Sequence, residues 1–183
     1  MRRVVVSGET SAGKTTFSRV LAERLQVPVI ELDALYWGPG WTPTPRDEFR
    51  ERVSTVAAGD AWVLDGNYSS ARDLVWPRAD TIVWLDPPFR VLLWRLFLRT
   101  NRRILTREEL WNGNRERVNN AYFSRSSLYV WLFGTHGRHQ HEWPLALGQY
   151  PHLQVVRFRS SRDAARWLEN VTAGSAADGP AGR

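Results

Sequence analysis

The segment GETSAGKT at residues 8–15 matches the pattern G-x-x-x-x-G-K-[ST] at every fixed position. A β-branched run at residues 3–7 precedes it and predicts a buried strand. Residues 16–25 follow it and place their apolar side chains on one face of a predicted helix. A strand, a loop with two glycines and a helix, in this order, form the context that a phosphate-binding loop requires. The segment therefore predicts an α/β fold built around a nucleotide phosphate site.

The residue types in this loop have chemical reasons. Gly8 and Gly13 can adopt backbone angles that a Cβ disfavours, which lets the chain wrap closely around a phosphate. Lys14 reaches the β- and γ-phosphates and acts in catalysis, the Thr15 hydroxyl binds Mg²⁺, and Thr16 meets the α-phosphate. The loop residues that we expect to contact ATP are Gly8, Ser11, Ala12, Gly13, Lys14, Thr15 and Thr16.

Lys14 is also the only lysine in the chain, since the other 24 of the 25 basic residues are arginine. A sequence with so strong a preference for arginine keeps its one lysine inside the phosphate loop. There a slim point charge fits, whereas a planar guanidinium does not. This exception strengthens the interpretation of the loop.

The composition is that of one globular domain. The chain has 183 residues, of which 43% are hydrophobic and 24% are charged. It has no cysteine, so we expect neither disulfides nor a thiolate metal site. No stretch approaches the roughly 18 uninterrupted apolar residues of a membrane span. We expect a cytoplasmic protein, monomeric or homodimeric, without a membrane partner.

The net charge of +6 leaves nucleic acid as an alternative partner. The arginines gather in one segment rather than along a stripe, which favours an enzyme that handles phosphate. We therefore expect a small-molecule partner and keep nucleic acid as the less favoured one.

Strands and helices alternate along the chain, which predicts a parallel sheet with helices on both faces. The predicted strands are 3–7, 29–32, 61–65, 81–85 and 153–158. The predicted helices are 16–25, 46–58, 70–76, 89–103, 116–134, 142–149 and 161–171, with a polar turn at 136–141. Residues 172–183 are rich in Gly, Ala, Ser and Pro and predict a disordered tail.

Three aspartates follow predicted strands, and ligands of parallel sheets bind beyond the carboxyl ends of the strands. We predict that Asp65 binds Mg²⁺, because Gly66 after it leaves room near the phosphates. Asp86 is the less favoured candidate for the metal, because the two prolines after it predict a stiff exit from the strand; its alternative role is a helix cap or turn residue. Asp33 either accepts the proton of the phosphoryl acceptor or braces the loop that follows it.

The segment after Asp33 is rich in aromatic residues, Gly and Pro. Tyr36, Trp37 and Trp41 either stack on a ligand or form the hydrophobic underside of this loop. The chain lacks the Asn-Lys-x-Asp motif of guanine recognition, and Asp65 is not followed by the glutamate that activates water in many ATPases. Transfer to a bound acceptor is therefore favoured over hydrolysis.

An arginine-dense segment follows the fourth predicted strand. Its basic residues are Arg95, Arg99, Arg102, Arg103, Arg107, Arg115 and Arg117. Arginines stabilise the charge that spreads over the γ-phosphoryl oxygens, and a segment that closes over ATP excludes water. We predict a lid at about residues 99–120, in which Arg99 and Arg103 contact ATP and act in catalysis. A solvated charged helix face is the alternative.

These elements together resemble the P-loop kinases related to adenylate and shikimate kinase, and more narrowly the adenylate-kinase-like family of DNA topology modulation proteins. The matching stretches are VVVSGETSAGKTT, ELDALYWGPGW, AWVLDGNYS, TIVWLD and the arginine-dense helix with GNRE after it. The resemblance implies a three-layer αβα P-loop NTPase fold with a five-stranded parallel sheet of order 2-3-1-4-5. It also implies an acceptor-binding insertion at about residues 34–60 and a lid after the fourth strand.

The resemblance implies roles for single residues as well. Asp65 with Gly66 is similar to the Asp-Gly that ends the third strand of adenylate kinases. Asp33 resembles the strand-end aspartate with which shikimate and gluconate kinases bind a hydroxyl acceptor. Asn67 and Tyr68 stand where adenylate kinases have an arginine that holds the nucleotide acceptor, which argues against AMP. The predicted acceptor contacts are Asp33, Trp37, Asn67 and Arg72.

The sequence thus predicts one kinase domain over residues 1–171 that uses ATP and Mg²⁺. Its acceptor is a small molecule: a nucleotide, a nucleoside or another hydroxyl compound. A P-loop regulator that uses ATP as a switch on nucleic acid is the alternative, and an ATPase that drives a partner is a third possibility.

Overall fold

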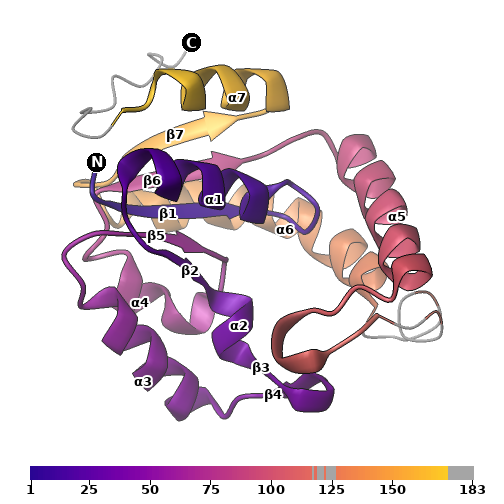
Figure 1. Ribbon diagram of the computed structural model, residues 1–183. Coiled ribbons are helices and arrows are strands. Elements are labelled where there is room, and N and C mark those ends of the chain that lie inside the picture. The colour runs from indigo at the N-terminus through magenta and orange to yellow at the C-terminus, as the bar shows by residue number, and fades with distance from the viewer. Residues whose placement is uncertain (117, 119–121, 123–126, 173–183) are drawn as a thin grey trace.

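The computed structural model describes residues 1–116, 118, 122 and 127–172. Five strands of this described part form one parallel sheet in the order β2-β5-β1-β6-β7 (Figure 1). The strands are β1 (Arg3–Gly8), β2 (Val29–Glu31), β5 (Trp62–Asp65), β6 (Thr81–Leu85) and β7 (Gln154–Phe158). The predicted order 2-3-1-4-5 is therefore confirmed, and so is the three-layer α/β architecture.

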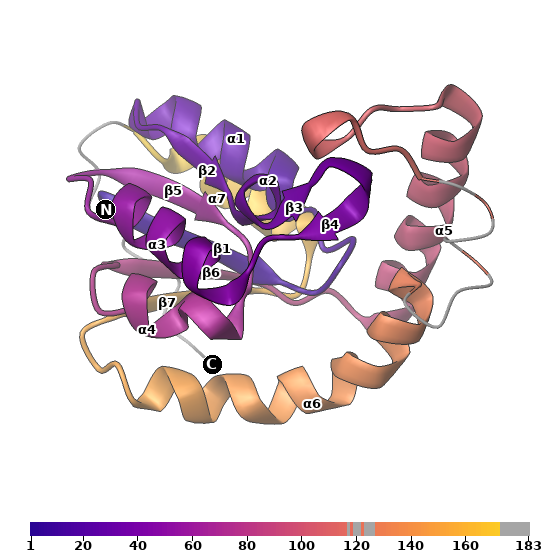
Figure 2. The same cartoon turned by 90° about the horizontal axis from the view of Figure 1, so that it is seen from below.

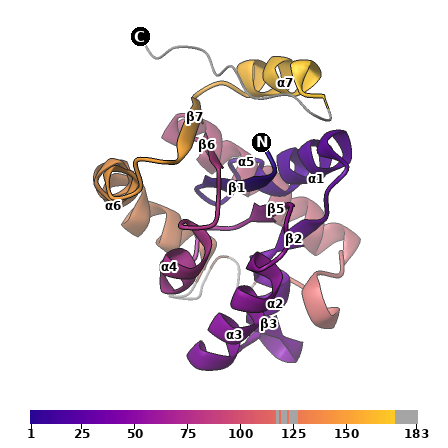
Figure 3. The ribbon, with the colours of Figure 1, turned by 90° about the vertical axis from the view of Figure 1, so that its left-hand side faces the viewer.

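Helices cover both faces of the sheet. They are α1 (Lys14–Leu25), α2 (Leu32–Tyr36), α3 (Arg46–Ala57), α4 (Arg72–Val75), α5 (Phe89–Thr106), α6 (Leu128–Gly148) and α7 (Ser161–Asn170). Figure 3 shows α1 and α7 on one side of the sheet and α4 and α6 on the other. α5 stands beyond the end of the sheet, beside the first turns of α6 (Figure 2).

The central strands β1, β5 and β6 are apolar on both sides because both of their faces are buried. In β1, Val4 and Val6 pack into the cluster with α1 and α7, whereas Val5 packs into the cluster with α3 and α4. In β6, Val83 and Ile82 divide between the two clusters in the same way. Successive side chains of a strand point to opposite faces, so one short apolar run supplies both cores.

The segment after β2 contains more structure than the sequence predicted. The strand ends at Glu31, one residue before the predicted end, and Asp33 lies in the first turn of α2. A two-stranded antiparallel ribbon, β3 (Trp37–Gly38) and β4 (Thr42–Pro43), flanks the 3₁₀ turn η1 (Pro39–Trp41). We call residues 37–43 the aromatic loop.

The prediction for residues 116–149 was wrong in one respect. The predicted polar turn at 136–141 is part of α6, a single helix from Leu128 to Gly148. Buried Leu132, Thr135, Trp143 and Ala146 lie on one face of this helix, and His139 continues the same spacing between them. The stretch resembles a turn in sequence because its inward-facing positions, His136, His139 and Gln140, are polar rather than apolar. The predicted helix before residue 127 falls mostly outside the described residues.

Two further predictions are touched only in part by the structure. Residues 173–183 of the predicted disordered tail lie outside the described residues. Within the described residues, no helix combines the length and apolar character that crossing a bilayer requires.

Candidate phosphate and acceptor site

The phosphate loop turns sharply where β1 ends, and its first glycine is required there. Gly8 has a φ of +147°, and a Cβ on it would lie 2.2 Å from the backbone oxygen of Leu85 in β6. Gly13 has a φ of +97° and caps the start of α1. The helix start has no side-chain cap and no acidic residue in its first turn. Its free amides and positive dipole end therefore suit an anion such as a phosphate.

Lys14 folds back onto its own loop in this structure. Its Nζ donates a hydrogen bond of 3.0 Å to the backbone oxygen of Glu9, and the amide of Ala12 donates to the same oxygen at 3.2 Å. The ammonium is thus already inside the loop that would surround a phosphate. It has one neutral partner that a phosphate oxygen can replace.

Thr15 and Asp65, which the sequence predicts as Mg²⁺ ligands, lie side by side. The Thr15 hydroxyl donates to Oδ2 of Asp65 at 2.6 Å, and Asp65 is only 6% exposed. Its Oδ1 is buried and has no hydrogen-bond partner among the described residues. Burial raises the pKa of Asp65 above its usual value, although the Lys14 charge and the Thr15 hydrogen bond oppose this rise.

This pair fits Mg²⁺ by its chemistry. Magnesium prefers oxygen ligands and is usually held by one or two protein groups together with waters and substrate phosphates. Across the residues that the structure describes, no three His, Cys, Asp or Glu side chains gather into a metal cage. The unpaired Asp65 oxygen next to the Thr15 hydroxyl is the arrangement expected where the metal arrives with a nucleotide.

Gly66 has a different role from the predicted one. Its φ is +145°, and a Cβ on it would lie 2.8 Å from the Cβ of Leu32 in α2. The glycine therefore makes room for α2 to pack against the end of β5, rather than for a phosphate. This packing brings Asp33 to the same edge of the sheet as Asp65.

A pocket of about 350 Å³ opens next to the phosphate loop, between α1 and α7. Ser11, Gly13 and Thr16 line one side of it. Arg95 of α5 lines the other side and donates from Nη2 to the Ser161 hydroxyl at 2.7 Å. The volume suits a nucleoside. The sequence places Arg95 in the arginine-dense segment but does not predict that it contacts ATP. Its position beside the pocket depends on Ser161, which lies 66 residues away and is brought close only by the packing of the strands.

On the acceptor side, Asp33 is bound by a residue that the sequence analysis did not select. The Tyr68 hydroxyl, in the loop after β5, donates to Asp33 Oδ1 at 2.5 Å. Burial, followed by the charge and hydrogen bond of Asp33, raises the pKa of Tyr68, so its hydroxyl stays protonated. Asp33 and Tyr68 each follow a strand that ends at this edge of the sheet, and this shared position is the sequence signal that could have predicted their contact.

The aromatic residues of this region pack mainly on each other. The ring of Tyr36 lies 4.8 Å from Trp37, 5.2 Å from Phe49 and 4.8 Å from Tyr68. Phe49 is fully buried, whereas Trp37 is partly exposed. The cluster therefore forms a hydrophobic base under Asp33. A stacking role for Trp37 toward an acceptor stays a prediction.

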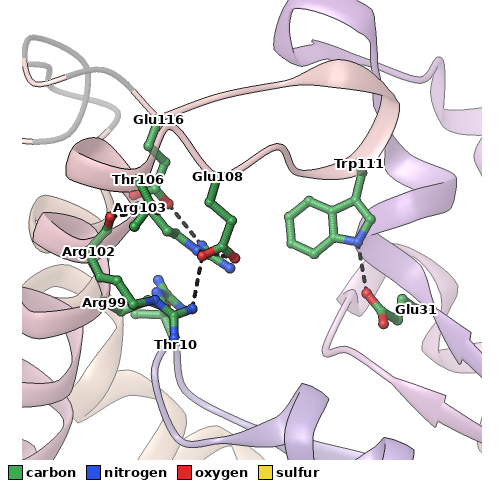
Figure 4. Close-up of polar contacts among 9 residues, drawn as sticks. All are labelled: Thr10, Glu31, Arg99, Arg102, Arg103, Thr106, Glu108, Trp111 and Glu116. Carbon is green, nitrogen blue, oxygen red and sulfur yellow. Dashed lines mark hydrogen bonds and ion pairs between the residues drawn. The ribbon is translucent and has the colours of Figure 1, made fainter.

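Arg99 lies between the phosphate loop and the acceptor side. Its Nη2 donates to the Thr10 hydroxyl at 3.2 Å (Figure 4). Burial and then the nearby Arg103 charge lower the pKa of Arg99 to about 10, while Glu116 and Asp33 oppose this shift. The side chain stays charged at neutral pH and interacts with both sides of the site.

Arg103 is held by acids of the predicted lid. Its Nη1 lies 3.0 Å from Glu116 and its Nε lies 3.5 Å from Glu108 (Figure 4). Only 14% of its side chain is exposed. In this arrangement the Arg103 charge is neutralised within the lid, and contact with ATP, as predicted, requires Arg103 to exchange these partners for phosphate oxygens.

The lid also contacts the aromatic loop across the site. Trp111 donates from Nε1 to Glu31 Oε2 at 2.8 Å (Figure 4). The Asn114 side chain donates to the Gly38 oxygen at 2.9 Å and accepts from the Trp41 amide at 2.8 Å. The segment from Glu108 to Glu116 thus bridges α5 and the aromatic loop.

Two further predicted acceptor residues, Asn67 and Arg72, lie beside Tyr68. The Arg72 guanidinium stacks 4.6 Å over the ring of Trp76, and burial lowers the pKa of Arg72. Asn67 and Arg72 line a small cavity together with Tyr68. Among the described residues, Arg72 forms no hydrogen bond or ion pair with Asp33, so acceptor binding by Asn67 and Arg72 stays a prediction.

Asp86 is fully engaged in structural contacts. Its carboxylate accepts hydrogen bonds from Arg157 of β7 and Gln140 of α6. It thus fastens the end of β6 to its neighbours, which is a broader role than the predicted cap or turn. This leaves Asp65 as the strand-end carboxylate beside the phosphate loop.

Comparison with known proteins gives matches by structure alone. No protein-family model matches the chain, and no curated protein matches it in sequence. A shikimate kinase from Bacteroides thetaiotaomicron has a TM-score of 0.54 and 17% identity, over 92% of this chain and 97% of that one. A shikimate kinase from Acinetobacter baumannii has a TM-score of 0.53 and 19% identity, over 92% of each chain. A gluconokinase from Sinorhizobium meliloti 1021 has a TM-score of 0.52 and 22% identity, over 92% of this chain and 94% of that one.

The chain has the P-loop NTPase fold of these kinases. At identities this low, the likeness establishes the fold and not the reaction. The narrower resemblance to the DNA topology modulation proteins stays a prediction.

Proposed function

We propose that the protein is an ATP- and Mg²⁺-dependent kinase that transfers the γ-phosphoryl group to a hydroxyl of a small molecule. The observation that carries this proposal is the position of Arg99. It is hydrogen-bonded to Thr10 of the phosphate loop and lies within electrostatic reach of Asp33. A kinase uses a carboxylate at this place to orient its acceptor, whereas the water-activating glutamate of many ATPases follows the strand-end aspartate, where this chain has Gly66.

On the donor side, the residues of the phosphate loop bind and orient ATP. The amides at the start of α1 hold the phosphates, and Lys14 exchanges the Glu9 oxygen for a phosphate oxygen. Thr15 and Asp65 would hold Mg²⁺, which neutralises charge on the β- and γ-phosphates. Arg95 and Ser161 bound the pocket for the nucleoside.

On the acceptor side, Asp33 orients the attacking hydroxyl. Tyr68 occupies Oδ1 and leaves Oδ2 to accept the hydroxyl proton. The acceptor oxygen bonds to the γ-phosphorus as the bond to the β-phosphate oxygen breaks, and ADP leaves. Arg99 and, after release from its acids, Arg103 stabilise the charge on the transferring group.

The proposal is tested with γ-labelled ATP, Mg²⁺ and a panel of hydroxyl acceptors that includes sugars, sugar acids, nucleosides and nucleotides. We expect transfer to one class, and loss of transfer in Lys14→Ala. Label released only as inorganic phosphate, with every acceptor in the panel, would contradict a kinase. An unchanged transfer rate in Lys14→Ala would contradict the assignment of the donor site.

A nucleic-acid-linked ATP switch is the second candidate. It is favoured by the net charge of +6 and by an exposed aromatic pair on α5, Trp94 and Phe97, whose rings stack at 5.9 Å. Exposed aromatic rings beside arginines can stack on unpaired bases. A salt series decides: DNA or RNA binding that weakens steeply with salt supports the switch, and no binding at moderate salt removes it.

A further inference from the structure

The second residue of the phosphate loop makes a contact that the motif does not require. Glu9 occupies a position where the pattern accepts any residue, yet it is only 6% exposed. Its Oε1 lies 2.7 Å from Nδ1 of His139, and its Oε2 lies 3.4 Å from the Thr135 hydroxyl, which donates to the Trp131 backbone oxygen at 2.8 Å. The Glu9 carboxylate is therefore held chiefly by His139 of α6, which lies on the opposite side of the sheet from α1 (Figure 3).

Glu9 in turn fixes the functional part of the loop. Its backbone oxygen accepts from Lys14 Nζ and from the Ala12 amide. A shift of Glu9 would therefore move the lysine and one of the amides that surround a phosphate. Glu9 therefore binds α6 through its side chain and Lys14 through its backbone oxygen.

The helix is suited to this role by its sequence pattern. His139 lies on the buried face of α6, between Thr135 and Trp143 at a spacing of four residues on either side. The side chain of His139 is 18% exposed, and the ring of Trp131 packs against it at 5.7 Å. His141, two residues further along the same helix, is exposed and lies off this face.

The neighbouring loop residue is held by the other helix that flanks the lid. Thr10 accepts from Arg99 of α5, where the predicted lid begins, whereas Glu9 is bound by α6, which follows the lid in the chain. Glu9 and Thr10, which are consecutive in the phosphate loop, thus bind α6 and α5, respectively.

We propose that His139 is a positioning residue for the phosphate loop. By binding the Glu9 carboxylate, it keeps the loop in the shape that receives ATP before ATP arrives. The inference rests on the proposed function, because it concerns the same ATP site. Preorganisation of this kind lowers the cost of ordering the loop on binding, so it should appear as tighter ATP binding.

The test compares three single variants by calorimetric titration with Mg·ATP. His139→Leu removes the hydrogen bond, His139→Asn keeps a side-chain N–H near Nδ1, and His141→Leu is the matched control. We expect His139→Leu to weaken ATP binding about tenfold, as the loss of a hydrogen bond to a charged group predicts. We expect His139→Asn to bind within about twofold of wild type, and His141→Leu to bind as wild type does.

Backbone amide hydrogen exchange supplies a readout that needs no ligand. In the ATP-free protein, His139→Leu should speed exchange in residues 8–15 and leave β7 and α7 unchanged. If His139→Leu is unstable because Glu9 is left buried without a partner, the double variant Glu9→Gln/His139→Leu removes that charge. A double variant with restored stability, wild-type ATP affinity and wild-type exchange overturns the proposal; persistent weak binding and fast loop exchange support it.

The outcomes separate this inference from the proposed function. If wild type does not bind Mg·ATP, the proposed function fails, while hydrogen exchange in the free loop still tests the role of His139. If wild type binds ATP and Lys14→Ala does not, but His139→Leu matches His141→Leu in affinity and loop exchange, the inference alone is overturned.

Discussion

The substitution Lys14→Arg tests whether the one lysine of the chain is chemically necessary. It keeps the charge and follows the preference of the chain for arginine at all other 24 basic positions. The side chain of Lys14 fits inside its own loop, with Nζ 3.0 Å from the Glu9 oxygen. A guanidinium is planar, larger and one atom further along the chain, so it does not fit between the same backbone atoms.

The expected size of the effect follows from the contact that is lost. A hydrogen bond that involves a charged group contributes about 1.5–3 kcal/mol. If arginine cannot place a donor where Nζ meets a phosphate oxygen, Mg·ATP binding weakens roughly 10- to 150-fold. The stability of the ATP-free protein should change little, because Lys14 is partly exposed and its partner there is a neutral carbonyl.

The assay is calorimetric titration with Mg·ATP, together with thermal unfolding of the free protein. The reverse exchange Arg166→Lys, at an exposed position of α7, is the matched control and should bind ATP as wild type does. Wild-type affinity in Lys14→Arg would refute the reasoning, because the lysine would then reflect chance rather than the shape of the loop.

Three further substitutions test other parts of the site. Asp65→Asn should raise the melting temperature of the ATP-free protein, because burial raises the pKa of Asp65 and the ionised carboxylate therefore destabilises the folded state. This gain in melting temperature should be absent below the usual aspartate pKa of about 4 and should grow as the pH rises above it. The substitution should also remove the Mg²⁺ dependence of ATP affinity, and a lower melting temperature at pH 7 would contradict the account. Tyr68→Phe frees Oδ1 of Asp33 and should lower kcat for the accepted substrate while the KM for ATP stays constant; steady-state kinetics that show the opposite would place Tyr68 on the donor side. Trp111→Phe removes the bond to Glu31 and should speed hydrogen exchange across residues 108–116, whereas unchanged exchange would mean that this contact does not hold the lid.

The sheet was predictable because its strands are local and apolar. The central strands β1, β5 and β6 are short β-branched or apolar runs bounded by turn residues, and burial on both faces makes such runs easy to recognise. The helices that cover the sheet were predicted less accurately than its strands. The α6 prediction failed at residues 136–141, where the helix faces the phosphate loop with a histidine instead of an apolar residue.

The candidate site divides in the same way. Gly8, Lys14 and Thr15 follow from the local motif, and Asp65 from its place at a strand end. Tyr68 and Arg95 did not follow, since their roles depend on partners that are distant in sequence. Tyr68 reaches Asp33 across 35 residues of chain, and Arg95 reaches Ser161 across 66.

The sequence by itself determined the phosphate loop, because its function depends on backbone angles and side chains within eight consecutive residues. The tertiary structure alone decided what holds that loop. Glu9 looks like a variable position until α6 brings His139 to it from 130 residues away. A motif is encoded locally, whereas a buried carboxylate takes its partner from whichever element packs against it, and that packing is a property of the whole fold.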